Sequence, residues 1–402
     1  MPSSAKKLLL FLNSLIIITA HTYAWAETPV PEPAVRAFYN LTYPLDNAPG
    51  GIIVLKNGKF SAITGKGTTS KFNAQLLEPV VIGSWKGTKV AALVIAYSTG
   101  GSGNFRRLYF LVNEKGKWQP RAWASLGDRV KVKYLGIEKH GILTVGMVTH
   151  APGDPMCCPT RKVARLYMVK DRKLLPLKTA PVHLFPDQVH FKPGILQGNV
   201  RLRLVPAQGF SSHGLVKTPP YPSHIALTVN GRDVMRIFPA RDYIDMWLEK
   251  NDFTIKIAIN RIKRMIYKKT ADFSPPLPIL PPQPGLNDLA ARPSVLKLQD
   301  GAGIEFIGRI TKNLSCIGPD NLHYYFMGLA NQDKYVISFI QKISIKQAPD
   351  SIWTCSKDIN GLEKQIKDVG QYIDSLKDAD FMPRISTMEK FLASIDIEDQ
   401  TH

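Results

Sequence analysis

The feature that most constrains this chain is a run of short apolar segments separated by tight turns, extending from Gly51 to about Pro176. Segments rich in Val, Ile, Leu and aromatic residues alternate with breaks that contain Gly, Asn or Asp, as in an all-β domain. This spacing predicts an antiparallel β-meander that closes as a sandwich or a barrel. The expected strands cover residues 52–55, 59–63, 79–85, 90–98, 108–112, 118–124, 130–137, 142–149 and 163–169.

One expected strand alternates charged and apolar residues over 129–134, with the sequence RVKVKY. Successive side chains of a strand point to opposite faces, so one set would face the core and the other set the solvent. The core set is Val130, Val132 and Tyr134. The solvent set is the cationic stripe of Arg129, Lys131 and Lys133, which we take as candidate ligand-binding residues.

The chain changes character near Pro181, where strand patterns begin to alternate with helical ones. We expect a basic antiparallel β-domain over 27–178, followed over 179–398 by an α+β domain with an antiparallel sheet and C-terminal helices. The stretch 274–285 carries six prolines, which exclude a helix or a central strand and predict an extended connector. Further expected strands cover 200–205, 224–229, 295–298, 304–310, 323–329 and 335–340, and expected helices cover 240–269, 362–376 and 385–395.

The later part of the helical segment 240–269 has a basic amphipathic pattern, with Ile255, Ile259, Ile262 and Ile266 on one side. Such a helix either packs on a core with a solvated basic face or lies on a membrane surface. We favour the core-packed helix.

The N-terminus has the order of a secretory signal peptide. Lys6 and Lys7 precede an apolar run over 8–20, and the small residues Ala24 and Ala26 then form a cleavage site. We expect removal of residues 1–26 by cleavage near Ala26, no transmembrane helix in the mature chain, and a periplasmic or secreted location.

The formal net charge is +20, and most of it belongs to the first domain. Residues 27–180 hold 23 Lys and Arg against 9 Asp and Glu, a difference of +14. A field of this sign attracts anionic partners such as lipid headgroups or acidic polysaccharide, whereas the plainer interpretation is a solvated cationic surface. No specific nucleic-acid-binding motif accompanies the charge.

The four cysteines allow three pairings. A bond between Cys316 and Cys355 would close a 40-residue segment and leave the adjacent Cys157 and Cys158 to each other. A vicinal bond requires a distorted or cis peptide, because adjacent Cα atoms lie about 3.8 Å apart across a trans peptide. Two alternatives remain: cross-pairing, and a reactive or metal-binding dithiol whose further ligands would be His150 and Met156.

The segment Gly127–Thr160, which contains GDPMCCPT, resembles a segment of uncharacterised bacterial exported proteins. It is similar to the LppP/LprE-type lipoproteins, which carry a CCP motif. The resemblance is firmest over 77–176 and implies export but no activity. This chain departs from the lipoproteins because no cysteine follows the expected cleavage site, so lipid anchoring is not implied.

No catalytic motif stands out. HExxH, GxGxxG and Walker patterns are absent, and in Gly100–Asn104 an asparagine replaces the second glycine of a nucleophile elbow. We therefore predict no catalytic residue and no cofactor. The favoured hypothesis is an exported, non-enzymatic protein that binds an anionic envelope or extracellular ligand. The alternative is a redox-active or metal-handling protein that uses the loop of Cys157 and Cys158.

Overall fold

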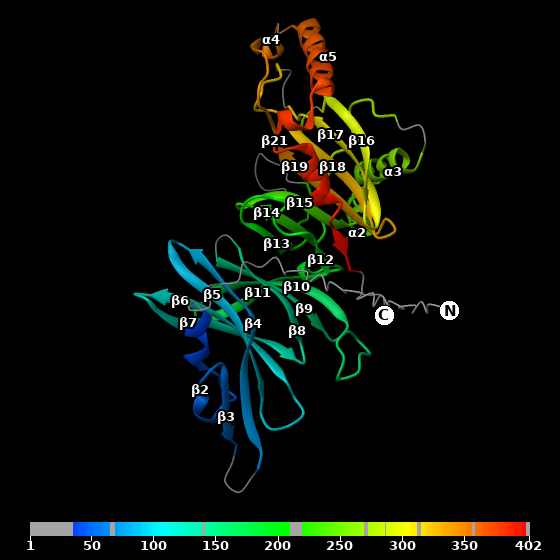
Figure 1. Cartoon of the computed structure of the whole chain (residues 1–402). Helices are drawn as coiled ribbons and strands as arrows, with labels where there is room; N and C mark the ends of the chain where they lie inside the picture. Colours follow the sequence, from blue (N-terminus) through cyan, green and yellow to red (C-terminus); the bar gives the residue numbers. More distant parts are fainter. Residues whose placement is uncertain are drawn as a thin grey trace, which may run out of the picture.

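The structure is a computed structural model. It describes residues 35–64, 69–138, 141–209, 219–268, 272–285, 287–311, 315–355 and 358–398. The expected signal peptide, residues 1–26, lies outside the described residues. Strands predominate, and two large sheets carry most of them (Figure 1). The predicted combination of a mainly β region and an α+β region with C-terminal helices is confirmed.

The first sheet has nine strands in the order β3-β4-β5-β6-β7-β11-β10-β9-β8. All neighbouring pairs are antiparallel except β11 and β7, which run parallel. The edges β3 and β8 are not paired with each other, so the sheet does not close into the barrel that we considered. It curves instead until β8 packs against β4. The strands of this region are β1 (Thr42–Pro44), β2 (Ile52–Val54), β3 (Lys59–Ile63), β4 (Lys71–Trp85), β5 (Thr88–Ser98), β6 (Phe105–Glu114), β7 (Lys117–Asp128), β8 (Lys131–Ile137), β9 (Ile142–Thr149), β10 (Arg161–Lys170) and β11 (Lys173–Pro181).

Strand β5 shows why this region reads as almost continuously apolar. Alternate residues of β5 enter two different cores: Leu93 and Ile95 join the cluster that holds Phe38 and Tyr43, whereas Ala92 and Val94 join the cluster that holds Tyr167. A strand buried on both faces needs apolar residues at every position. The short β1–β2 ribbon covers one of these faces.

The second sheet has seven strands in the order β13-β14-β15-β19-β18-β17-β16. Helices α2 and α3 pack on one face of it, and α5 and α6 pack on the other. Its elements and the smaller ones around it are β12 (Val189–His190), β13 (Val200–Val205), β14 (His224–Val229), β15 (Arg232–Pro239), α2 (Ala240–Leu248), α3 (Thr254–Tyr267), β16 (Ala290–Leu298), β17 (Gly301–Gly308), β18 (His323–Ala330), β19 (Tyr335–Lys342), β20 (Ser344–Ile345), α4 (Asp350–Trp353), α5 (Ile359–Ser375), β21 (Phe381–Met382), α6 (Ile385–Leu392) and β22 (Asp396–Ile397).

The Pro-rich connector 274–285 crosses a face of this sheet. Leu277 and Leu280 are buried in the same core as helix α3. The sheet continues across the connector, because β15, which precedes it in the chain, pairs with β19, which follows it. Ile255, Ile259 and Ile262 of α3 are buried there too, so α3 is the core-packed helix that we favoured.

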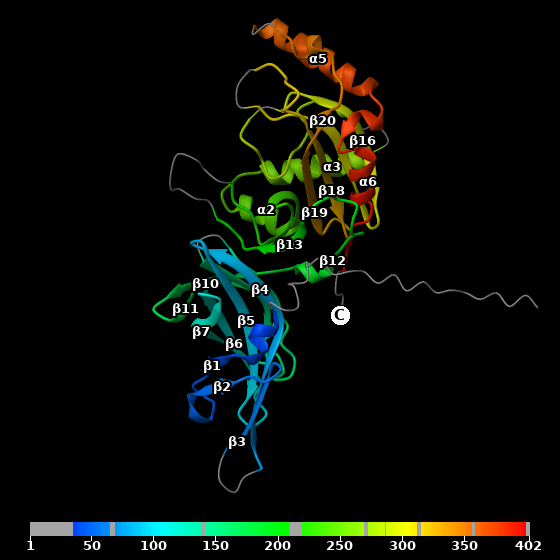
Figure 2. The same cartoon turned by 60° about the vertical axis from the view of Figure 1, so that its left-hand side comes forward.

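The two sheets share one core at their junction, where β12 and β13 lie (Figures 1 and 2). Tyr134 and Val148 of the first sheet are buried in one cluster with Phe185 and Leu204. Two ion pairs flank this cluster: Lys133 Nζ lies 3.1 Å from Asp187, and an amino group of Arg203 lies 3.6 Å from Glu138. The two halves are therefore held together by an apolar contact with paired charges at its margin.

The prediction that Tyr134 faces the same core as Val132 is wrong. Val132 pairs with Met147 and packs inside the first sheet, but the register shifts between Val132 and Tyr134. This β-bulge inserts one extra residue and turns Tyr134 to the opposite face, where it packs in the junction core. Tyr134 therefore contacts the second domain, while Lys133 beside it stays exposed and reaches Asp187 at the margin of the junction.

Gly146 provides a test of the junction. A Cβ atom at this position would lie 2.9 Å from the Cβ of Tyr134 and 3.0 Å from side-chain atoms of both Leu204 and Phe185. We expect Gly146→Val to lower the free energy of unfolding by about 1–3 kcal/mol through overpacking, measured by denaturant titration. The control Gly101→Val adds a side chain where nothing lies within 4 Å. Equal stability of the two variants would contradict this account of the junction.

Candidate functional site

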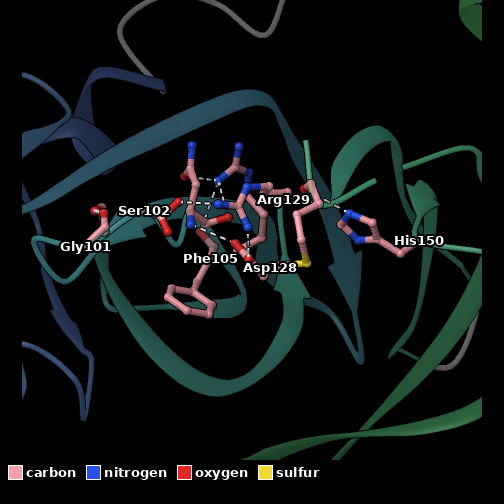
Figure 3. A network of polar contacts seen from close by, with 10 residues as sticks. Gly101, Ser102, Phe105, Asp128, Arg129 and His150 are labelled. Carbon is pink, nitrogen blue, oxygen red and sulfur yellow. Dashed lines mark hydrogen bonds and ion pairs between the residues drawn. The ribbon is translucent and has the colours of Figure 1, made fainter. Parts of the chain in front are cut away.

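Arg129, the first residue of the cationic stripe predicted on 129–133, joins two loops through polar contacts that we call the clamp. Arg129 forms an ion pair with Asp128 and donates a 2.5 Å hydrogen bond to the carbonyl of Ser102 (Figure 3). The Asp128 carboxylate accepts a 2.7 Å hydrogen bond from the backbone N–H of Asn104. Arg129 itself lies in the left-handed region, with φ of 51°, at the turn between β7 and β8. Its guanidinium therefore serves to hold the 100–104 loop.

The other two residues of the stripe have different surroundings. Lys131 and Lys133 are both exposed, but Lys133 reaches across the junction to form an ion pair with Asp187. The structure thus brings the three cations to one end of the first sheet but does not align them as a continuous solvent-facing row. Lys131 alone of the three both faces solvent and carries no ion pair among the described residues.

The cysteine loop lies beside this clamp and is organised by Asp154. Because Lys131 of β8 pairs with Val148 of β9, Arg129, which lies just before β8, and His150, which lies just after β9, are at the same end of this strand pair (Figure 3). The Asp154 carboxylate accepts hydrogen bonds from the backbone N–H groups of Ala151, at 2.7 Å, and Thr160, at 2.8 Å. These bonds, the one from Ala151 foremost, lower the pKa of Asp154. The loop is therefore closed by its own polar contacts.

The sulfur atoms pair as Cys157 with Cys158 and Cys316 with Cys355, so the cross-pairing alternative is wrong. The Cα atoms of Cys157 and Cys158 lie 3.8 Å apart, the separation of a trans peptide, and both residues are exposed. The peptide between them is therefore trans, not cis.

The four residues of the metal alternative lie together in this loop, but the His150 ring and both cysteine sulfurs are otherwise engaged. His150 Nε2 lies 3.1 Å from the carbonyl oxygen of Met156, and the two sulfurs are bonded to each other. Within the described residues, no group of three or more His, Cys, Asp and Glu side chains is placed to hold a metal ion. A dithiolate site on Cys157 and Cys158 would first require reduction of their bond.

The two disulfides should differ in their effect on stability. We expect the double variant Cys316→Ser/Cys355→Ser to lose about 2–4 kcal/mol of unfolding free energy, because its bond closes a long segment of the denatured chain. The matched variant Cys157→Ser/Cys158→Ser, in which the bond joins adjacent and exposed residues, should lose less than about 1 kcal/mol. Denaturant titration of both variants checks this, and similar losses would contradict it.

A second cationic feature, which the sequence reasoning did not single out, is the hairpin of β10 and β11. In its register Lys170 lies opposite Lys173, Met168 opposite Leu175, and Leu166 opposite Lys178. Directly opposed residues of an antiparallel pair project to the same face, so these six residues define one surface, which we call the outer hairpin face. Its signal in the sequence is the basic composition of 168–178, where Lys170, Arg172, Lys173 and Lys178 stand against the single acidic residue Asp171.

A pocket of about 330 Å³ lies in the second sheet, near the bulge in β16. The Glu305 carboxylate, 6% exposed, accepts a 2.5 Å hydrogen bond from the Ser294 hydroxyl and another from the Tyr324 hydroxyl. Arg292 and Glu389 also line the pocket. The sequence reasoning missed this site because β16, β17 and α6 are far apart in the chain and no spacing rule joins their residues.

The two glutamates of this pocket form a carboxyl pair. Burial raises the pKa of Glu389, and the charge of Glu305 raises it further, while Arg292 opposes the shift. The raised pKa favours the protonated form of Glu389, and a protonated carboxyl group can both donate and accept hydrogen bonds. The pocket is thus equipped to hold a polar small molecule.

The raised pKa of Glu389 has a consequence for stability. Below the ordinary pKa of 4.5, Glu389 is protonated in both the folded and the unfolded chain. As pH rises from 4.5 through the higher pKa of the folded state, the unfolded chain loses this proton first, so the free energy of unfolding falls. We expect Glu389→Gln, which mimics the protonated form, to remove part of the stability decline above pH 4.5. Parallel stability–pH curves for wild type and Glu389→Gln, from thermal unfolding, would contradict this.

Comparisons with known proteins add little to these observations. No protein-family model matches the chain, and no curated protein matches it. Among solved structures, the fold has a distant likeness to a xylan β-1,4-xylosidase from Bacillus halodurans, with a TM-score of 0.23 and 10% identity. The likeness covers 72% of this chain and 48% of the xylosidase, so this chain spans about half of that protein's length. No helix within the described residues is long and apolar enough to cross a membrane.

Proposed function

We propose that this protein is exported and acts outside the cytoplasm as a non-enzymatic binding protein for an anionic envelope component. The leader-like N-terminus and the paired sulfurs support export, because disulfides persist in oxidising compartments. The resemblance of the CCP segment to bacterial exported proteins agrees with this. The ligand would be recognised through the first domain.

The observation that carries the proposal is that carboxylates of the first domain form ion pairs with arginines and leave exposed lysines without an acidic partner within the described residues. Asp46, Glu114 and Asp128 are each engaged with one arginine of the same domain, namely Arg107, Arg121 and Arg129. Glu138 pairs across the junction with Arg203. Lysines at several positions, among them Lys131, Lys170 and Lys173, are exposed and form no ion pair within the described residues. The surplus positive charge is therefore left free to attract an anionic partner.

The proposal predicts salt-sensitive binding to anionic material by the full chain. We expect affinity for dextran sulfate, measured by titration calorimetry or fluorescence anisotropy, to fall steeply as ionic strength rises. The reason is that the Debye length shrinks from about 10 Å at 0.1 M salt to about 3 Å at 1 M. Neutral dextran is the control and should not bind.

The full chain is required for this test, because the first domain shares its junction core with the second. Absence of binding at low salt to both dextran sulfate and anionic vesicles would overturn the proposal. The variant Cys157→Ser/Cys158→Ser separates this proposal from the redox or metal alternative, since the binding proposed here does not need these sulfurs. Loss of binding in that variant would favour the alternative, whose supporting observation is the exposure of both cysteines.

A further inference from the structure

We propose that the outer hairpin face of β10 and β11 docks on the surface of an anionic lipid bilayer. This inference rests on the proposed function and names the partner within the class of anionic envelope components. Three features of the hairpin support it: the arrangement of its side chains, the exposure of its apolar residues, and the composition of its tip.

The side chains lie in ordered rows across the two strands. The row nearest the tip is Lys170 with Lys173, the next is Met168 with Leu175, and the third is Leu166 with Lys178. Further along the same face, Ala164 pairs with Ala180 and is buried in the junction core. The face thus runs from a buried base, through an apolar band, to a cationic end.

The apolar band is open to solvent. Met168 and Leu175 are each 38% exposed, and Leu177, which lies at the bulge in β11, is 49% exposed. Large apolar side chains gathered on one short hairpin lose favourable free energy to water, and burying them in a bilayer interface would recover it. Burial against a lipid surface needs no complementary protein shape, which suits a flat two-stranded face.

The tip concentrates positive charge. Lys170 and Lys173 oppose each other directly, an arrangement of like charges that disfavours the strand pair. Arg172 is exposed beside them, and Asp171 is the single acidic residue of the turn. Asp171 and Arg172 both lie in the left-handed region, with φ of 46° and 60°, so the turn is tight and the charges crowd at its end. A surface of anionic headgroups would relieve this repulsion.

The combination of exposed apolar residues and cations on one face favours a bilayer over a soluble polyanion as the partner. Polysaccharide would use the cations alone and would leave Met168, Leu175 and Leu177 in water. A second exposed apolar pair, Phe253 and Ile257 near the start of α3, has no excess of cations beside it, because Glu249 and Asp252 balance Lys250 and Lys256. The outer hairpin face, where apolar residues stand beside an excess of cations, fits an anionic bilayer better.

The test uses the full chain and vesicles made of equal parts of phosphatidylglycerol and phosphatidylcholine, with sedimentation to measure binding. We expect the apolar variant Met168→Ser/Leu175→Ser/Leu177→Ser to bind these vesicles about tenfold or more weakly while binding dextran sulfate as wild type does. The charge variant Lys170→Gln/Arg172→Gln/Lys173→Gln should weaken vesicle binding about tenfold or more as well. The control Phe253→Ser/Ile257→Ser should behave as wild type.

The results distinguish the lipid inference from the proposed function, which is binding of an anionic envelope component. Vesicle binding by the apolar variant at wild-type strength would overturn the lipid inference. Wild-type binding to dextran sulfate without vesicle binding would overturn it too, but would leave the proposed function standing with a polysaccharide-like partner. Failure to bind either probe would remove both.

A second measurement does not depend on loss of binding. In Leu175→Trp, insertion of the hairpin should place the new indole within reach of brominated acyl chains, which quench its fluorescence. We expect stronger quenching in Leu175→Trp than in wild type or in Ile257→Trp. Equal quenching in all three proteins would contradict insertion through this face.

Discussion

The close contact around Gly146 is the constraint on which the rest of the structure depends. Only a residue without a side chain allows Tyr134, Phe185 and Leu204 to converge at this point of β9. That convergence joins the nine-stranded and seven-stranded sheets through one apolar core. It also decides which parts of the first sheet remain in water, since Tyr134 of β8 and Ala164 of β10 are covered while Met168 and Leu175 of the β10–β11 hairpin are not.

Local pattern was sufficient to predict most elements. The apolar face of α3 and the strand patterns at 323–329 and 335–340 were predicted from periodicity, because burial on one side leaves a regular trace in the sequence. Pairing over long distances leaves no such trace. The sequence therefore did not predict that β15 pairs with β19, on the other side of the Pro-rich connector in the chain. It also did not predict the curvature that brings β8 against β4.

The site residues divide in the same way. Simple alternation placed Lys131 and Lys133 on one face correctly, but a single extra residue in the bulge moved Tyr134 to that face too. A bulge costs little and changes no composition, so alternation alone cannot reveal it. Pairing of Cys157 with Cys158 followed from elimination once Cys316 and Cys355 were joined. The carboxyl pair of Glu305 and Glu389 depends on the packing of α6 against the sheet, which no local pattern encodes.

The distribution of charge links these observations. In the first domain, Asp46, Glu114 and Asp128 are each matched to an arginine, whereas exposed lysines such as Lys131, Lys170 and Lys173 have no acidic partner within the described residues. In the second domain, Glu305 and Glu389 are instead gathered in a pocket. An anionic surface would attract the first region more strongly than the second, where 27 Lys and Arg stand against 23 Asp and Glu over residues 181–402. A chain with this uneven charge would therefore approach such a surface with its first domain forward.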